Sequence, residues 1–179
     1  GMLVTQLDVK LPEQEDQDSI GMMKHLLLRM AYGAQAGYSD FVYAEESLRS
    51  TTPLRMSRIT ERLLSSIDRE KVVLKRRENF ELLSSILSGF NVFTWDIDQT
   101  SVPLCYPLIL NKDTRKIKEK LSENGIYIPT YWHGVDTGRD SSVENILVNN
   151  CLAVPCDQRY STEDMYRLAN HVSSAIEDI

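Results

Sequence analysis

The chain has few of the residues from which self-contained catalytic motifs are built. It contains 3 histidines and 3 cysteines among 179 residues. It lacks the glycine-rich dinucleotide loop, the Walker lysine loop, the Cys-x-x-Cys pair and the His-Glu-x-x-His zinc motif. Because Cys105, Cys151 and Cys156 are odd in number and irregularly spaced, they cannot form a complete disulfide framework. We expect reduced, buried thiols and no metal site.

A large excess of one charge and long apolar runs are also missing. The 20 basic and 26 acidic residues give a net charge of −6, and the longest basic block is Lys75-Arg76-Arg77. Nucleic acid and an anionic membrane are therefore poor candidates for a partner. No stretch approaches the roughly 20 apolar residues of a membrane-spanning helix, and the start does not resemble a signal peptide. With 42% apolar residues, the composition predicts a folded cytoplasmic protein.

The first half of the chain has mostly helical periodicity. The alternating segment 3–9 predicts a short strand, and the acidic run 13–18 after it predicts a solvated connector. The segment 38–53 lacks a sustained period, so we interpret it as irregular with some helix. Three segments carry an apolar stripe at helical spacing and are predicted helices, the first of them beginning at Ser19: 20–36, 57–68 and 69–88.

The second half alternates strand and helix patterns. Apolar runs predict strands at 104–110, 126–129 and 151–155. Helices are predicted from Asp113 to Gly125, near 143–148, and after Ser161, where Asp164 completes a capping-box pattern. The predicted fold class is α/β (α+β), with a small three-stranded sheet, helices on one face and a helical section before it. The predicted parts are 1–18 (strand and connector), 19–89 (interdomain helical section) and 90–179 (small α/β domain).

Three strings in this order resemble a known family. They are "RMSRITERLLSSIDREKVVLKRRENFELLSSIL", "PLILNKDTRKIKEKLSENGIYIPTYWHG" and "ENILVNNCLAVPCDQRYSTEDMYRLANHV". Together they are similar to the interdomain helices and small C-terminal domain of DegT-type sugar aminotransferases, a branch of the fold-type I pyridoxal-phosphate enzymes. The likeness spans roughly residues 45–178. It implies a parent enzyme that moves an amino group between an amino acid and a nucleotide-linked keto sugar.

The resemblance also implies what this chain does not contain. In the family, the Schiff-base lysine and the groups that hold the pyridine ring lie in a large domain that precedes these segments. The eight lysines here fall on polar helix faces or in connectors, where nothing lowers the amine pKa. We therefore expect no cofactor in this chain and pyridoxal phosphate in the parent enzyme. We also expect a homodimer, because the helices at 20–36 and 57–88 present more apolar stripe than a small three-stranded sheet can cover. The resemblance offers Arg49, Arg55 and Ser57 as cofactor-binding residues, although Pro53 stands where the family often has a phosphate-binding asparagine.

Two loops are candidate substrate-binding sites. Tyr131, Trp132 and His133 combine aromatic rings with one titratable donor, which suits contact with a sugar or a base. The alternative is a loop whose tryptophan covers the edge of the core. Arg159 and Tyr160 lie before the last helix, where an arginine and helix amides could bind an anion. The alternative there is a plain turn and helix cap.

Two further interpretations complete the prediction. The basic run on the helix after residue 69 is interpreted as a solvated face, with Arg77 paired to Glu81. A rival to the aminotransferase interpretation is a non-catalytic module that binds a ligand or self-associates. The two differ in whether the apolar stripes of 20–36 and 57–88 are covered by a second copy.

Overall fold

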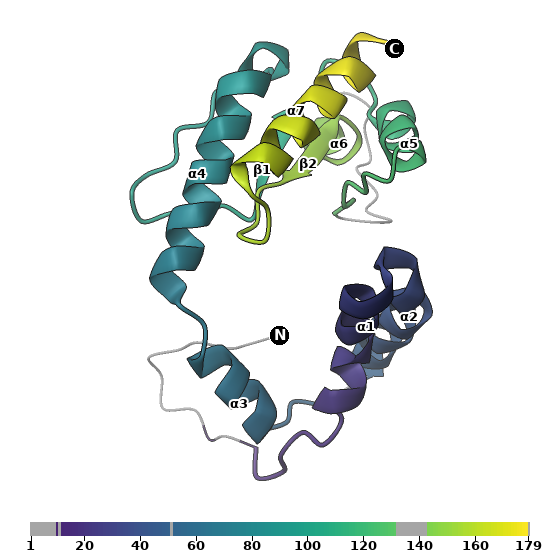
Figure 1. Cartoon of the computed structure of the whole chain (residues 1–179), viewed down its shortest axis with the longest axis vertical. Coiled ribbons are helices and arrows are strands. Elements are labelled where there is room, and N and C mark those ends of the chain that lie inside the picture. Colours follow the sequence, from purple (N-terminus) through teal and green to yellow (C-terminus); the bar gives the residue numbers. More distant parts are fainter. Residues whose placement is uncertain (1–9, 11, 51, 132–142, 179) are drawn as a thin grey trace. The chain divides into compact units, whose positions relative to one another are not determined.

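A computed structural model of the protein describes residues 10, 12–50, 52–131 and 143–178 (Figure 1). Contacts within the chain divide it into two units, Gly1–Ile67 (unit 1) and Asp68–Ile179 (unit 2). The described residues form seven α-helices and one sheet of two antiparallel strands. The predicted helix-rich mixed fold is therefore confirmed, with two strands in place of three.

Unit 1 is helical. Its helices are α1 (Ser19–Tyr32), α2 (Tyr38–Ser47) and α3 (Arg58–Ser65). The predicted first helix ends earlier than expected because Gly33 adopts a φ of 92°, a conformation that stops an α-helix and favours glycine. The segment 38–53, predicted to be irregular with some helix, is more helical than expected, since α2 fills most of it. Packing of α2 against α1 stabilises the helix in this segment.

Contact between α1 and α2 depends on a close approach at Gly37. A Cβ atom there would lie 2.4 Å from the His25 carbonyl oxygen, so only glycine fits without a shift of the backbone. Beside it, the rings of His25 and Phe41 meet edge to face with centroids 5.6 Å apart. An ion pair of 2.6 Å joins Lys24 to Asp40.

The acidic connector is bound rather than free. The Arg55 amide donates to the Gln14 carbonyl (2.8 Å), and the Asp16 amide donates to the Arg55 carbonyl (2.9 Å), forming an isolated parallel bridge between residues 15 and 55. Ser19 is the first residue of α1, and Asp18 occupies the cap position before it. The Ser19 hydroxyl donates a hydrogen bond to the Asp16 carboxylate. The predicted strand 3–9 lies outside the described residues.

Unit 2 holds the sheet. Its elements are α4 (Arg69–Leu87), β1 (Cys105–Ile109), α5 (Arg115–Glu123), α6 (Val143–Asn149), β2 (Cys151–Pro155) and α7 (Thr162–Glu177). All six were predicted with small differences at their ends. The capping box of Ser161 and Asp164 is present at the start of α7. Gly125, with φ 75°, terminates α5 as the sequence predicted.

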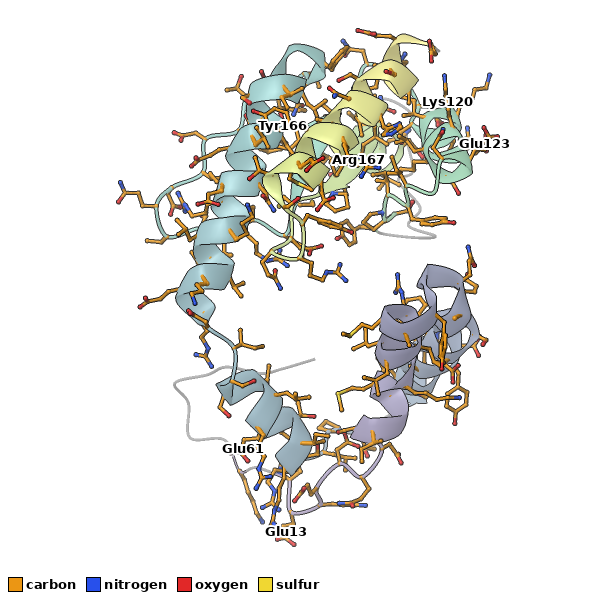
Figure 2. All side chains as sticks on the ribbon, in the orientation of Figure 1. Glu13, Glu61, Lys120, Glu123, Tyr166 and Arg167 are labelled. Carbon is orange, nitrogen blue, oxygen red and sulfur yellow. The ribbon has the colours of Figure 1, made fainter. Side chains whose placement is uncertain are left out.

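The core of unit 2 lies on one face of the sheet. The register pairs Tyr106 with Val154 and Leu108 with Leu152, and alternation places these four side chains on the same face. There α4 and α7 cover them, as Figure 1 shows. Ile117 and Leu121 of α5 join the same cluster. The outer face of α7 carries Tyr166 and Arg167, both exposed (Figure 2).

The predicted strand 126–129 was wrong. The Ile126 amide closes the end of α5 by donating to the Leu121 carbonyl (2.9 Å), and Ile128 packs against the core without entering the sheet. The segment before β1 lies along the outer edge of this strand and hydrogen-bonds to it. The side chains of Asn91 and Trp95 donate to the Pro107 carbonyl at 2.9 and 2.6 Å, so that position accepts no further strand.

The helix α4 belongs to unit 2 by its packing. Phe80, Leu83 and Leu87 are buried in the core cluster, and the division between the units falls immediately before this helix, at Asp68. The sequence analysis placed the same helix in the interdomain section 19–89. A periodic stripe indicates that a helix buries one face, but it does not say against which neighbour.

Candidate functional site

Arg76 lies at the centre of the polar side of unit 2. From the middle of α4 its Nε donates to Gln158 Oε1 (2.8 Å), and its Nη1 donates to the carbonyls of Pro103 (2.9 Å) and Leu104 (3.3 Å). One guanidinium thus joins α4, the entry to β1 and the loop after β2. The sequence analysis missed this role, because the partners lie 27 to 82 residues away along the chain.

Asn79, one turn further along α4, is 1% exposed. Its Nδ2 donates to the carbonyls of Asp157 (3.0 Å) and Tyr160 (3.3 Å) and lies 3.5 Å from that of Cys156. A buried amide is stable only when its donors find acceptors. Here the acceptors are the backbone of the loop that links β2 to α7.

That loop carries the predicted pair Arg159 and Tyr160. The guanidinium of Arg159 donates two hydrogen bonds to the Asp157 carboxylate, from Nε to Oδ1 at 2.8 Å and from Nη2 to Oδ2 at 3.0 Å. The same guanidinium lies 5.7 Å from the centroid of the Tyr160 ring. Burial alone would raise the pKa of Asp157. Hydrogen bonds from Arg159 and the charges of Arg159 and Arg76 outweigh it, so the pKa is lowered. The carboxylate is therefore ionised at neutral pH.

This arrangement bears on the predicted anion site. The Asp157 carboxylate occupies one edge of the Arg159 fork, and the Ser161–Asp164 capping box satisfies the start of α7. An incoming anion would meet both carboxylates, so it would have to displace Arg159 from Asp157. The segment thus has the turn-and-cap geometry of the alternative interpretation. Its use as a substrate contact stays a prediction.

Tyr131 ends the segment that follows α5, and it is exposed. Partial burial raises the pKa of its hydroxyl, and the charge of Arg76 acts on it in the opposite direction. The use of Tyr131 as a substrate contact stays a prediction. Trp132 and His133 lie outside the described residues, and their predicted roles stay predictions. We call Arg76, Asn79, Asp157, Gln158, Arg159 and Tyr160, which the contacts above join, the Arg76 cluster.

The cofactor-binding candidates lie in unit 1. Ser57 is buried; its hydroxyl caps α3 by accepting from the Thr60 amide (3.3 Å) and donates to Ser19 Oγ (2.7 Å). Arg55 forms an exposed ion pair with Glu15, and Arg49 is exposed. The contacts of Ser57 are those of a cap. The structure brings Arg55 and Ser57 to the start of α3, and cofactor binding there stays a prediction.

Two sequence interpretations of side chains are corrected. Arg77 is not a solvated partner of Glu81; its Nη1 donates to the carbonyls of Asp98 (2.8 Å) and Ser101 (2.7 Å), which fastens the loop before β1. Lys118 is not fully solvated either. Its Nζ donates to Thr130 Oγ1 (3.2 Å), and partial burial lowers its pKa. Of the lysines in the described ranges, this one comes nearest to the environment that an amine nucleophile needs.

The thiols are free and weakly acidic. Burial raises the pKa of Cys151 to about 11 and of Cys156 to about 12, and also raises that of Cys105. Thiols with such pKa values are protonated at neutral pH and poorly nucleophilic. Among residues 10, 12–50, 52–131 and 143–178, no group of three or more histidine, cysteine or acidic side chains is arranged to hold a metal ion.

Comparison with known proteins identifies no relative. No protein-family model, no curated protein and no solved structure matches the chain. None of the helices that could be searched is both long and apolar enough to cross a membrane.

Proposed function

We propose that this chain is the C-terminal part of a pyridoxal-phosphate-dependent sugar aminotransferase of DegT type. In this proposal it supplies interdomain helices and a small domain, and it does not transfer amino groups alone. The parent enzyme would use pyridoxal phosphate and a nucleotide-linked keto sugar. The three sequence strings described above are the origin of the proposal.

The observation that carries the proposal is the order of elements in unit 2. A long helix leads into a small sheet whose strands alternate with helices, and a capped C-terminal helix ends the unit. The resemblance implies this order for the interdomain helix and the small domain, but it also implies a third strand at 126–129, where the structure has none. The Arg76 cluster adds the Arg159 guanidinium and the Tyr160 ring, a combination that suits contact with a sugar or a base. Fold order alone does not define an activity, so the proposal needs a chemical test.

The test is covalent binding of pyridoxal phosphate. A Schiff-base lysine must be partly uncharged at neutral pH, which requires burial or a cationic neighbour. Lys118 is half-exposed and hydrogen-bonded to a threonine, and it lies on a helix of the small domain. We expect the purified chain, mixed with pyridoxal phosphate, to give no stable absorbance band that borohydride removes.

Lys118→Met is the matched control variant. A reducible band in the wild-type chain that disappears in this variant would contradict the proposal, because the chain would then carry its own cofactor lysine. The positive arm joins the chain to any lysine-bearing coding region found upstream of Met2. That protein should bind the cofactor and move an amino group from glutamate to a nucleotide keto sugar.

A second candidate, a self-associating module, is favoured by the apolar surface of unit 1. Ile20, Leu27 and Met30 on α1 are 68, 64 and 86% exposed, and Ile59 and Leu63 on α3 are also exposed. Monomeric proteins rarely leave so many large apolar side chains in water on neighbouring helices. Light scattering should give the mass of a dimer at micromolar concentration, and Leu27→Glu with Met30→Glu should shift it to a monomer. A monomeric wild-type chain would refute this candidate.

A further inference from the structure

The loop between β2 and α7 is held from outside by side chains of α4. Two α4 side chains donate hydrogen bonds to it, Arg76 to Gln158 and Asn79 to the loop backbone, and Lys75 donates to Thr162, the first residue of α7. Lys75 and Arg76 are partly exposed, whereas Asn79 is buried. Solvent competes least for the hydrogen bonds of Asn79, so its contribution to the loop geometry is the largest of the three.

The three acceptors of Asn79 belong to residues 156, 157 and 160, at the two ends of one turn. Within that turn the Tyr160 amide donates to the Asp157 carbonyl (3.3 Å), and the Arg159 amide donates to Asp157 Oδ1 (3.1 Å). Fixing both ends therefore fixes where the Arg159 guanidinium and the Tyr160 ring are presented. Asn79 itself is too deeply buried to touch a ligand.

We infer that Asn79 is a positioning residue: it holds the backbone of residues 156–160 so that Arg159 and Tyr160 face a nucleotide sugar with one defined geometry. The ligand class rests on the proposed function, whereas the hold on the loop does not. Replacing Asn79 with leucine keeps the volume of the side chain but removes both amide hydrogens. Three carbonyls would then lose the amide donor of Asn79, although the Asp157 carbonyl would keep the Tyr160 amide.

The experiment measures backbone amide signals of Asp157, Gln158, Arg159 and Tyr160 in the full chain by NMR. We expect Asn79→Leu to move or broaden all four, while the matched control Glu81→Gln, exposed on the same helix, leaves them in place. Unchanged loop signals in a folded Asn79→Leu protein would overturn the inference.

Asn79→Asp gives a second readout, the pH dependence of the loop amide signals. This dependence is not expected if Asn79 only fills space in the core. Its carboxylate would face three carbonyl oxygens and repel them, whereas the protonated acid has one O–H to donate. The loop signals should therefore lie closer to wild type at pH 5 than at pH 8. The neighbouring charged groups, Arg76, Asp157 and Arg159, keep their charge over this range, because the pKa of Asp157 is lowered and that of Arg159 is raised and arginine is protonated throughout. If Asn79→Leu does not fold, this pH profile decides, and a flat profile counts against the inference.

The ligand arm uses uridine diphosphate glucose as the probe. Wild type should show saturable shifts at Arg159 and Tyr160, and Asn79→Leu should weaken the apparent affinity at least about tenfold. If the probe moves no loop signal in wild type, the ligand role of the loop fails and the inference about presentation to a nucleotide sugar fails with it. The signals of the free variants still decide whether Asn79 positions the loop.

Discussion

The two units differ in how much of their apolar surface they bury. In unit 2, residues from α4, α5, α7 and both strands form one buried cluster. In unit 1, among its described residues, Ala44 is the one buried apolar side chain. Both units have helices with regular apolar stripes, yet only one of them covers its stripes. Apolar periodicity therefore identifies a helix, while a stable core needs a second apolar face to meet it.

The polar contacts show the same contrast. Within the part of the chain that the structure describes, the carboxylates whose pKa is clearly lowered all lie in unit 2: Asp98, Asp113, Asp157 and Asp164. Each one holds a local turn or cap, in a unit that is already held by its core. In unit 1, the connector bridge to Arg55 and the cap at Ser57 are among the few contacts that fasten its segments. We expect unit 1 to open before unit 2.

The largest predicted effect tests the two apolar surfaces directly. Phe80, 3% exposed, packs edge to face on Tyr106 with ring centroids 5.1 Å apart. Phe80→Ala should lower the free energy of unfolding by about 3 to 5 kcal/mol, because it removes a buried ring and leaves a cavity. Denaturant unfolding followed by circular dichroism measures this loss.

The matched substitution in unit 1 is Leu27→Ala. Leu27 is mostly exposed, so its removal should change the free energy of unfolding by less than about 0.5 kcal/mol. A loss as large as that of Phe80→Ala would break the comparison. It would mean that the α1 surface is covered in solution, in agreement with the self-association candidate.

A smaller effect is expected at the helix caps. Ser161→Ala removes the capping box of α7, a helix packed in the core, and should cost about 1 kcal/mol of global stability. Ser57→Ala removes the cap of α3, none of whose residues is buried. We expect this variant to speed amide hydrogen exchange in α3 while the main unfolding transition keeps its midpoint. Equal shifts of the main transition would argue that the units unfold together.

The smallest predicted effect is the loss of stability in acid that follows from the lowered pKa of Asp98. Hydrogen bonds from the Thr100 side chain and amide, and from Ser101, lower the pKa of Asp98 to about 2. Because the folded pKa lies below the unfolded one, Asp98 stabilises the fold above about pH 4, and this contribution disappears as the pH falls toward 2. Asp98→Asn should therefore lower the thermal midpoint slightly at pH 6 and leave it unchanged near pH 2. Asp96→Asn, two residues away and exposed, is the control, and an equal shift in both variants would contradict the assignment.

The sequence analysis was most successful where local pattern and packing agree. The helix predicted between Asp113 and Gly125 is present as α5 and buries Ile117 and Leu121, and Ser161 was predicted to cap α7 and does. It failed at 126–129, where a short apolar run has the composition of a strand but is used to close α5 and fill the core. Four-residue runs carry too little period to separate these outcomes. The loop of Arg159 and Tyr160 could be named from the sequence, but the contact of Arg76 with that loop could not.

The sequence by itself determined where most helices lie, where the caps of α7 and α5 fall and that the runs 104–110 and 151–155 form strands. Those features depend on residues within a few positions of one another, so short stretches of the sequence are enough to predict them. Only the tertiary structure decided that the sheet has two strands, that α4 packs with the sheet, and that Asn79 meets Tyr160 from 81 residues away. Such contacts depend on which surfaces meet after folding, and a polar side chain on a helix looks the same in sequence whether water or a distant carbonyl accepts its hydrogen.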